Sequence, residues 1–329
     1  MEFPRQAETR RFNTSFCLQL ANNILLENAA ENGSNTVISP FSFHLILSMI
    51  AAGSKGRTLK QLFYCLGSTS LEQINSSASQ MIDLASPANE RNGSAIGDPD
   101  LCFANGVWVA EGLNLKPYFQ EIVAGLYHAV AKEADFANKQ KSMPGPRLQQ
   151  EGSFAGFKIL KLPYKTNHPT RKFAMYFFLP DARDGLKDLL HMFKANPGYF
   201  DKRFDLVEEK IPDFWVPRFR FEFEFEASEA MIGMGLDLPF DRYKAELTEM
   251  VYGTRRLFVR KVFHKCLIEV NEEGTEAAAC TAVIIEQQSM SMRPIASFVA
   301  DHPFMFMVKE EISGVVFFVG SVLNPLLNC

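Results

Sequence analysis

The sequence predicts an α+β fold, with helices in the first third of the chain and strands through most of the remainder. Apolar residues recur at close to helical spacing over residues 11–28, whereas RFRFEFEF, within residues 210–225, alternates with the period of a strand. Of the 329 residues, 47% are hydrophobic, so the chain can bury a large core. Because no linker rich in Pro, Gly or Ser separates two halves, we expect one domain over residues 1–329.

The first third carries most of the helical signals. A short strand predicted over residues 37–40 ends at a proline, and a strongly apolar helix follows it over 41–52. The remaining elements predicted in this part are helices over residues 11–28, 58–66, 71–84 and 115–126 and strands over 101–110 and 128–136.

Strands dominate after residue 150. The run over residues 210–225 would place four phenylalanines on one face, because side chains alternate along a strand. These are Phe219, Phe221, Phe223 and Phe225. Further strands are predicted over residues 154–163, 173–180, 257–270, 298–309 and 314–322, and helices over 186–193 and 229–236.

Charge, hydropathy and cysteine spacing limit the partners and the location that we expect for this chain. The net charge is −4 and no long basic run occurs, so nucleic acid is not expected as the main partner. No apolar run is long enough to span a bilayer, so no membrane association is expected. The N-terminal MEFPRQAETRRF lacks the apolar region of a secretory signal, and the six cysteines show no paired spacing. Together these features predict free thiols in the cytoplasm or nucleus.

Motifs for catalysis or metal binding are absent from the sequence. The six histidines lie far apart, and the chain contains no HExxH, CxxC, nucleophile elbow or P-loop. We therefore predict no enzyme activity, no metal site and no cofactor.

The segment over residues 269–297 follows an apolar strand signal and changes character at Gly274, which tolerates the backbone angles of a hinge. Composition alone is compatible with an Ala-rich surface loop or a short helix. The alternative is a loop that can become a strand. One face of that strand would be small and uncharged at its leading end, as needed to enter an existing sheet. That face would carry Thr275, Ala277, Ala279 and Thr281.

Several motifs occur in a fixed order along the chain. They are NTVISPFSFHLILSMIAAGSKGRTLKQLFYCLG, LCFANGVWVAEGLNLKPYF, FKILKLPY, FAMYFFLP, VFHKCLIEV, VNEEGTEAAACTAV, FVADHPFMFMV and GVVFFVGSVLNP. In these motifs the chain resembles the serpin family, most closely its plant branch, nearly from end to end. The resemblance implies N-terminal helices packed on a large mixed β-sheet, smaller sheets, and an exposed reactive-centre loop over about residues 274–297.

The resemblance also implies a mechanism, in which loop insertion is an established family property. A serine or cysteine protease attacks the loop and forms an acyl-enzyme; the cut loop then inserts into the main sheet and distorts the protease before deacylation. Fourteen residues beyond Gly274, counted as in the family, the reactive bond falls at Gln288–Ser289. Glutamine there points away from trypsin-like enzymes, whose acidic pocket accepts Arg or Lys.

Other expectations rest on the same resemblance. The partner would be the target serine or cysteine protease, bound by a monomer, and an extracellular location is an alternative by family analogy. The hinge that starts insertion would comprise Glu272, Glu273, Gly274, Thr275, Glu276, Ala277, Ala278, Ala279, Cys280 and Thr281.

One internal segment departs from the family pattern. Between Phe136 and Phe157 the family has a helix across the main sheet, a central strand beside the insertion slot, and strands of a second sheet. Here residues 137–156 are polar, rich in Gly, Pro and Gln, and without apolar alternation before Phe154. We therefore expect an internal deletion near residues 137–156 that removes the central strand of the main sheet.

His264, with Ser39 and Ser42 nearby, matches the family's sheet-opening region, where the histidine hydrogen-bonds across the opening. A lone histidine on a strand is otherwise a satisfied core residue. Its usual asparagine partner would lie in the missing segment, so the hydrogen-bond network is expected to be incomplete.

Two functions remain open at the level of sequence. The hinge predicts a suicide inhibitor of serine or cysteine endopeptidases. The missing strand favours a non-inhibitory serpin-like protein, which would be a protease substrate or a binding partner, because a loop gains its full ladder only between two strands.

Overall fold

The computed structural model describes the chain in segments, which exclude the first eleven residues, the last two and several internal stretches. The described residues are 12–31, 33–85, 106–110, 113–134, 150–154, 156–164, 171–202, 204, 206, 213–253, 256–270 and 297–327.

Helices are concentrated in the N-terminal part, as predicted. They are α1 (Ser15–Glu31), α2 (Pro40–Ala52), α3 (Gly56–Leu66), α4 (Leu71–Ala85), α5 (Pro117–Gly125), α6 (Leu186–Ala195), α7 (Gly198–Asp201), α8 (Ser228–Gly233) and the 3-10 turn η1 (Leu238–Phe240).

Strands make up most of the C-terminal part. They are β1 (Thr36–Ile38), β2 (Gly106–Ala110), β3 (Val130–Ala134), β4 (Gln150–Phe154), β5 (Phe157–Pro163), β6 (Phe173–Pro180), β7 (Asp213–Trp215), β8 (Phe219–Glu226), β9 (Phe263–Val270), β10 (Ser297–Val299), β11 (Phe304–Glu310) and β12 (Val316–Val322).

The described strands form one large sheet and three pairs. The large sheet has six strands in the order β1-β12-β11-β6-β5-β4, and each strand runs antiparallel to its neighbours. The pairs β2–β3 and β7–β10 are parallel, and β8–β9 is antiparallel. Within the described residues, the large sheet is therefore wholly antiparallel, and parallel pairing is confined to the smaller pairs β2–β3 and β7–β10.

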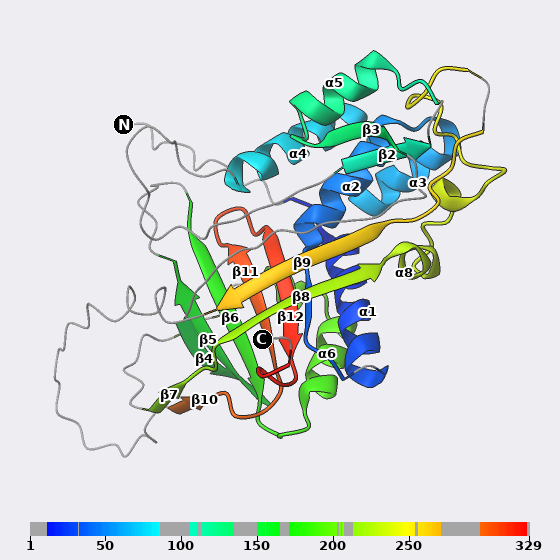
Figure 1. Ribbon diagram of the computed structural model, residues 1–329. Helices are drawn as coiled ribbons and strands as arrows, with labels where there is room; N and C mark the ends of the chain where they lie inside the picture. Colours follow the sequence, from blue (N-terminus) through cyan, green and yellow to red (C-terminus); the bar gives the residue numbers. More distant parts are fainter. Residues whose placement is uncertain are drawn as a thin grey trace, which may run out of the picture.

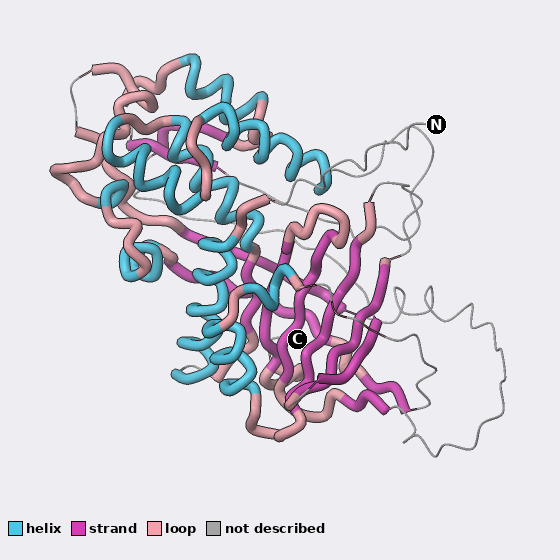
Figure 2. Tube along the Cα trace, turned by 180° about the vertical axis from the view of Figure 1, so that it is seen from behind, coloured by secondary structure: helices cyan, strands magenta, loops and turns pink. Residues whose placement is uncertain are grey.

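The six-stranded sheet is covered on both faces. On one face the Phe219 ring of β8 lies 5.5 Å from that of Phe306, and Figure 1 shows the β8–β9 pair crossing this sheet. Phe178, one residue beyond the partner of Phe306, faces the other way, and its ring lies 5.1 Å from Phe193 of α6. Figure 2 shows from behind that helices gather on one side of the molecule and strands on the other.

This double coverage explains the unbroken apolar runs of the central strands. Every residue of β6 and β11 is buried, which is expected where a sheet is packed on both faces. Gly320 of β12 lies at a close approach, because a Cβ there would be 2.4 Å from the Thr36 carbonyl oxygen and 2.3 Å from Cζ of Phe306.

Two predicted strands are each broken at a proline. Residues 210–225 form β7 and β8, separated by a segment that contains Pro217, and residues 298–309 form β10 and β11, separated at Pro303. Proline has no N–H to donate to a ladder, so each segment leaves its sheet and starts again in another. The periodicity was correct, but the continuity was wrong.

Two other strand predictions need correction, and one short helix was missed. β4 lies within residues 137–156, where no strand was predicted before Phe154; its pairing with β5 supplies the order that its polar sequence QEGSF does not. Residues 257–262, predicted as part of a strand, precede β9, and the short α7 was not predicted. The predicted strand over residues 101–110 is described only over β2, since 101–105 lie outside the described residues.

Phe306→Ala tests the packing between β8 and the six-stranded sheet. Phe306 is fully buried, so its truncation is expected to reduce the free energy of unfolding by about 3–5 kcal/mol, measured by urea denaturation. Tyr64→Ala, at a site 88% exposed on α3, is the control and is expected to change it by less than about 0.5 kcal/mol. Equal effects of the two substitutions would contradict this packing.

Candidate functional site

β9 is the strand that leads into the predicted reactive-centre loop. Its side chains alternate, with His264, Cys266, Ile268 and Val270 buried and Phe263 exposed. The alternation fixes its register against β8, from Phe219↔Val270 to Glu226↔Phe263, because a one-residue slip would expose the buried face. The strand ends at Val270, directly before the predicted hinge.

One edge of β9 has no strand partner in the described part of the chain. β9 pairs with β8 alone, and β2 pairs with β3 alone, so these four strands form two separate sheets. A strand edge carries a row of backbone N–H and C=O groups that can accept another strand. The central strand expected to be missing is likewise not among the described strands between β3 and β5.

His264 joins β9 to the beginning of α2. The backbone N–H of Ser39 donates to Nε2 of His264 at 3.0 Å, and the backbone N–H of Ser42 donates to Oγ of Ser39 at 3.1 Å. Ser39 is the N-cap of α2 and is followed by Pro40 in the first turn, a favourable start for a helix. The structure therefore brings all three predicted sheet-opening residues together.

Aromatic rings enclose this histidine. The imidazole is stacked on Phe43 with ring centroids 4.5 Å apart, and it meets Phe225 of β8 edge-on at 5.5 Å. Burial among these groups lowers the pKa of His264 to about 3. The ring is therefore neutral at physiological pH, with Nε2 unprotonated so that it can accept the Ser39 N–H.

Cys266 lies beside this histidine, but the pair does not have the features of a nucleophilic dyad. Its Sγ is 2.9 Å from Nε2 of His264, on the same buried face of β9. Burial raises the pKa of the Cys266 thiol well above its usual range and lowers that of His264, so neither group favours a thiolate–imidazolium pair. No local pattern in the sequence predicts this contact.

The opposite face of the β8–β9 pair carries paired charges. Lys265 forms ion pairs with Glu222 and Glu224, and Lys261 pairs with Glu226 at 3.0 Å. Hydrogen bonding to Glu222 raises the pKa of Lys265, and Glu224 adds to the effect. The pair thus presents an apolar face to the core and a charged face outward.

The C-terminal root of the loop is held by β5 of the six-stranded sheet and by β7. Nζ of Lys158, on β5, donates to the carbonyl oxygen of Ser297 at 3.0 Å, and the N–H of Ala300 donates to the carbonyl oxygen of Trp215 at 2.8 Å. Sequence reasoning missed these contacts, because Lys158 and Ser297 are far apart in the chain.

The hinge over residues 272–281 and the reactive bond Gln288–Ser289 lie outside the described residues. Their assignments therefore stay predictions from the sequence. Their two anchor points, Val270 and Ser297, are both described.

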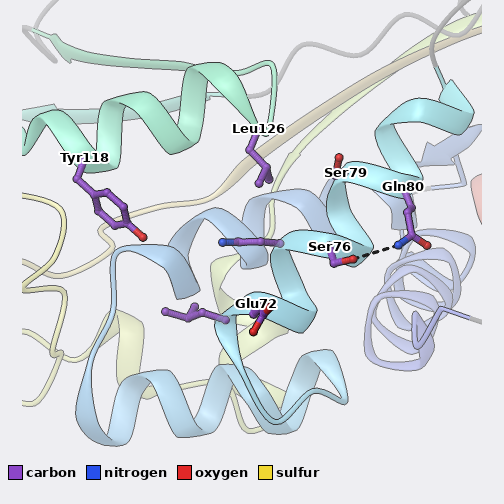
Figure 3. Close-up of a pocket in the computed structure, with 8 residues that line it drawn as sticks. Glu72, Ser76, Ser79, Gln80, Tyr118 and Leu126 are labelled. Atoms are coloured by element: carbon purple, nitrogen blue, oxygen red, sulfur yellow. Dashed lines mark hydrogen bonds between the residues drawn. The ribbon is translucent and has the colours of Figure 1, made fainter.

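An open depression of about 550 Å³ lies elsewhere, between α4 and α5 (Figure 3). Glu72, Ser76, Ser79 and Gln80 project into it from α4, and Tyr118 from α5. Gln80 is hydrogen-bonded to Ser76 at 3.1 Å, so part of the lining is already paired. The depression does not adjoin β9 or β10 and plays no part in the predicted insertion.

The described segments offer neither a metal site nor a membrane-spanning helix. There, no three His, Cys, Asp or Glu side chains are grouped so that they could hold a metal ion. No described helix combines the length and apolar character needed to cross a bilayer.

His264 predicts a specific pH dependence. Between its unfolded pKa of about 6.5 and its folded pKa of about 3, the unfolded chain binds a proton that the folded chain does not, so the free energy of unfolding decreases as the pH is lowered through this range. His264→Asn is expected to reduce the slope of unfolding free energy against pH by up to about 1.4 kcal/mol per unit.

The slope is measured by urea unfolding between pH 6.5 and 4. His191→Asn, at an exposed position of α6, is the matched control. Buried His44, whose pKa burial lowers to about 4, contributes to the slope in both variants and cancels in the comparison. A slope unchanged by His264→Asn would contradict a buried neutral imidazole.

Comparison with known proteins gives one consistent result. The profile described as "Serpin (serine protease inhibitor)" matches residues 11–144 and 146–325, and the two matches meet inside the segment where a deletion was expected. Serpin-ZX of Arabidopsis thaliana is 34% identical, with 94% of this chain and 96% of that protein aligned. Serpin-ZXA of Oryza sativa subsp. japonica is 35% identical, with coverages of 95% and 96%.

A solved structure gives the same result. Arabidopsis AtSerpin1, described as being in a native stressed conformation, superposes with a TM-score of 0.77 at 32% identity, covering 95% of this chain and 98% of that one. The alignment with Serpin-ZX runs over 383 positions, more than the 329 residues here, so that relative contains residues that this chain lacks. These matches run nearly from end to end, and they agree with the position of β9 and the contacts of His264. This chain therefore belongs to the serpin family.

Proposed function

We propose that this serpin is a suicide inhibitor of serine or cysteine endopeptidases, acting as a monomer that presents Gln288–Ser289 as the bond attacked. The observation that carries the proposal is the edge of β9. This edge is without a strand partner in the described segments, and β9 ends where the predicted hinge begins.

The chemistry of the first step is supplied by the protease. Its nucleophile attacks the carbonyl carbon of Gln288, the bond to Ser289 breaks, and the new amino group of Ser289 takes up the proton from the nucleophile. An ester or thioester then joins Gln288 to the protease. In the proposed second step, residues 274–288 fold back along β9 as an antiparallel strand and carry the acylated protease with them.

The number of receiving strands sets the driving force. Each net backbone hydrogen bond contributes about 1 kcal/mol, so a strand entering between two neighbours and forming roughly ten bonds gains on the order of 10 kcal/mol. With β9 as the single neighbour, about half of these bonds form, and the gain is about 5 kcal/mol. The relative AtSerpin1 is described in a native stressed conformation. This description supports a store of free energy in the native state of that protein.

The second candidate is a non-inhibitory serpin that proteases cleave without being trapped. The observation in its favour is that β2–β3 and β8–β9 form separate sheets in the described segments, so β9 has no opposite neighbour there. If insertion with this smaller driving force is slower than deacylation, the protease is released. The chain is then a substrate.

Cleavage of the loop separates the two candidates. Nicking near Gln288 with a broad-specificity protease is expected to increase the free energy of unfolding by about 5 kcal/mol, because the cut strand pairs with β9. The measurement is urea unfolding of intact and nicked protein. No increase in the free energy of unfolding, or a decrease, would support the function as a protease substrate and exclude the function as an inhibitor.

Charge substitution within the hinge tests the direction of insertion. Thr275→Arg places a charge on the predicted inward face and is expected to abolish both the stability gain after nicking and any SDS-stable protease complex. Glu276→Arg, on the predicted outward face, is the matched control and is expected to preserve both. If both variants, or neither, lose the stability gain and the protease complex, the predicted alternation of inward and outward side chains in the hinge is contradicted.

A further inference from the structure

Trp215 and Val299 form an exposed apolar pair beside the C-terminal root of the loop. Trp215 is 71% exposed and Val299 is 38% exposed, and the two are directly opposite each other in the parallel pair β7–β10. Residues opposite each other in register face the same side of a sheet, so the two side chains lie together. The adjacent pair, Phe214↔Phe298, faces the other side, where Phe298 is fully buried.

This pair is attached rigidly to the body of the protein. The carbonyl oxygen of Trp215 accepts from the N–H of Ala300 at 2.8 Å, and the root residue Ser297 accepts from Nζ of Lys158 at 3.0 Å. Just beyond, Nε2 of His302 lies 2.7 Å from the carbonyl oxygen of Pro180. A partner that binds Trp215 would therefore have little backbone to order, which favours affinity.

The reactive bond lies within reach of this pair. Val299 follows Ser289 by ten residues, so the two are at most about 36 Å apart even in a fully extended chain. An endopeptidase of about 250 residues has a radius of gyration of about 18 Å and thus a width of about 45 Å. Protease–inhibitor interfaces engage roughly 20–30 residues on each side, so the footprint extends beyond the cleaved stretch.

From these observations we infer that Trp215 and Val299 form an exosite, a second contact surface for the endopeptidase that engages the loop at Gln288–Ser289. The inference rests on the proposed attack at the loop but not on trapping. Tryptophan is enriched among residues that dominate binding energy, and adjacent exposed apolar side chains on a fixed strand pair offer such an anchor.

The two tryptophans of the chain permit a direct test. Trp108, on β2, is 55% exposed and lies at the other end of the molecule from β7 in Figure 1. The protein is labelled with 5-fluorotryptophan, and the two ¹⁹F resonances are assigned with Trp108→Phe and Trp215→Phe. The probe is unlabelled subtilisin whose catalytic serine is replaced by alanine, after the active enzyme has been shown to cut at or beside Gln288.

The expected result is a shift of the Trp215 resonance at saturating inactive subtilisin, with the Trp108 resonance unchanged. Trp215→Ala is expected to weaken binding of the intact protein about tenfold, whereas Tyr64→Ala, at an exposed position of α3, leaves it unchanged. Affinity for an isolated peptide of residues 271–296 supplies the reference value for the loop without the exosite.

Other outcomes overturn the inference. An unchanged Trp215 resonance at saturation, or binding of Trp215→Ala as tight as that of the wild type, excludes the exosite. If the Trp215 resonance shifts with the concentration of this protein when no protease is present, the surface binds a second copy of this chain instead. Inactive subtilisin cannot be trapped, so its binding does not depend on loop insertion. If it shifts the Trp215 resonance but nicking the loop does not increase the free energy of unfolding, the exosite is upheld and inhibition is excluded.

Discussion

The backbone edge of β9 is the constraint on which the proposed function of this protein depends. One edge of the strand is paired with β8 over eight residues, and the other has no strand partner in the segments that the structure describes. Unpaired edges normally favour aggregation and are covered or blunted in native proteins. In the proposed mechanism the segment that follows Val270 adds a strand to this edge, so the edge would store binding energy for the chain's own loop.

The surroundings of β9 keep this edge in register. His264, Cys266, Ile268 and Val270 are buried on its inner face, while charged residues on β8 and β9 are paired on the outer face. His264 adds a long-range hydrogen bond to Ser39 at the beginning of α2, so movement of β9 would disturb the apolar helix behind it. This contact couples β9 to the start of α2 and requires an unprotonated Nε2 on His264.

Local sequence patterns predicted most of the fold, and tertiary contacts account for what they missed. The alternation over RFRFEFEF predicted the inward face of β8, since Phe219 and Phe221 are buried and Arg220 is exposed. Pro217 and Pro303 broke strands that looked continuous. β4 could not be predicted, because its order comes from pairing with β5 and not from its own side chains.

The candidate site was predictable only in part. The contact between Ser39 and His264 spans 225 positions and was expected only from the resemblance to serpins, as no local pattern encodes it. Lys158 at the loop root and Cys266 beside His264 carried no signal, because a lysine and a buried cysteine on strands are ordinary residues. The hinge and reactive bond remain predictions from sequence.

Amide hydrogen exchange along β9, before and after cleavage at Gln288–Ser289, tests whether the cut loop pairs with the open edge of this strand. In an antiparallel pair the N–H groups of a strand alternate in direction, so those not bonded to β8 point toward the open edge. If the loop inserts, these amides exchange fast in the intact protein and are strongly protected after cleavage, while exchange of the amides bonded to β8 is unchanged. Protection before cleavage, or none after it, would contradict insertion beside β9.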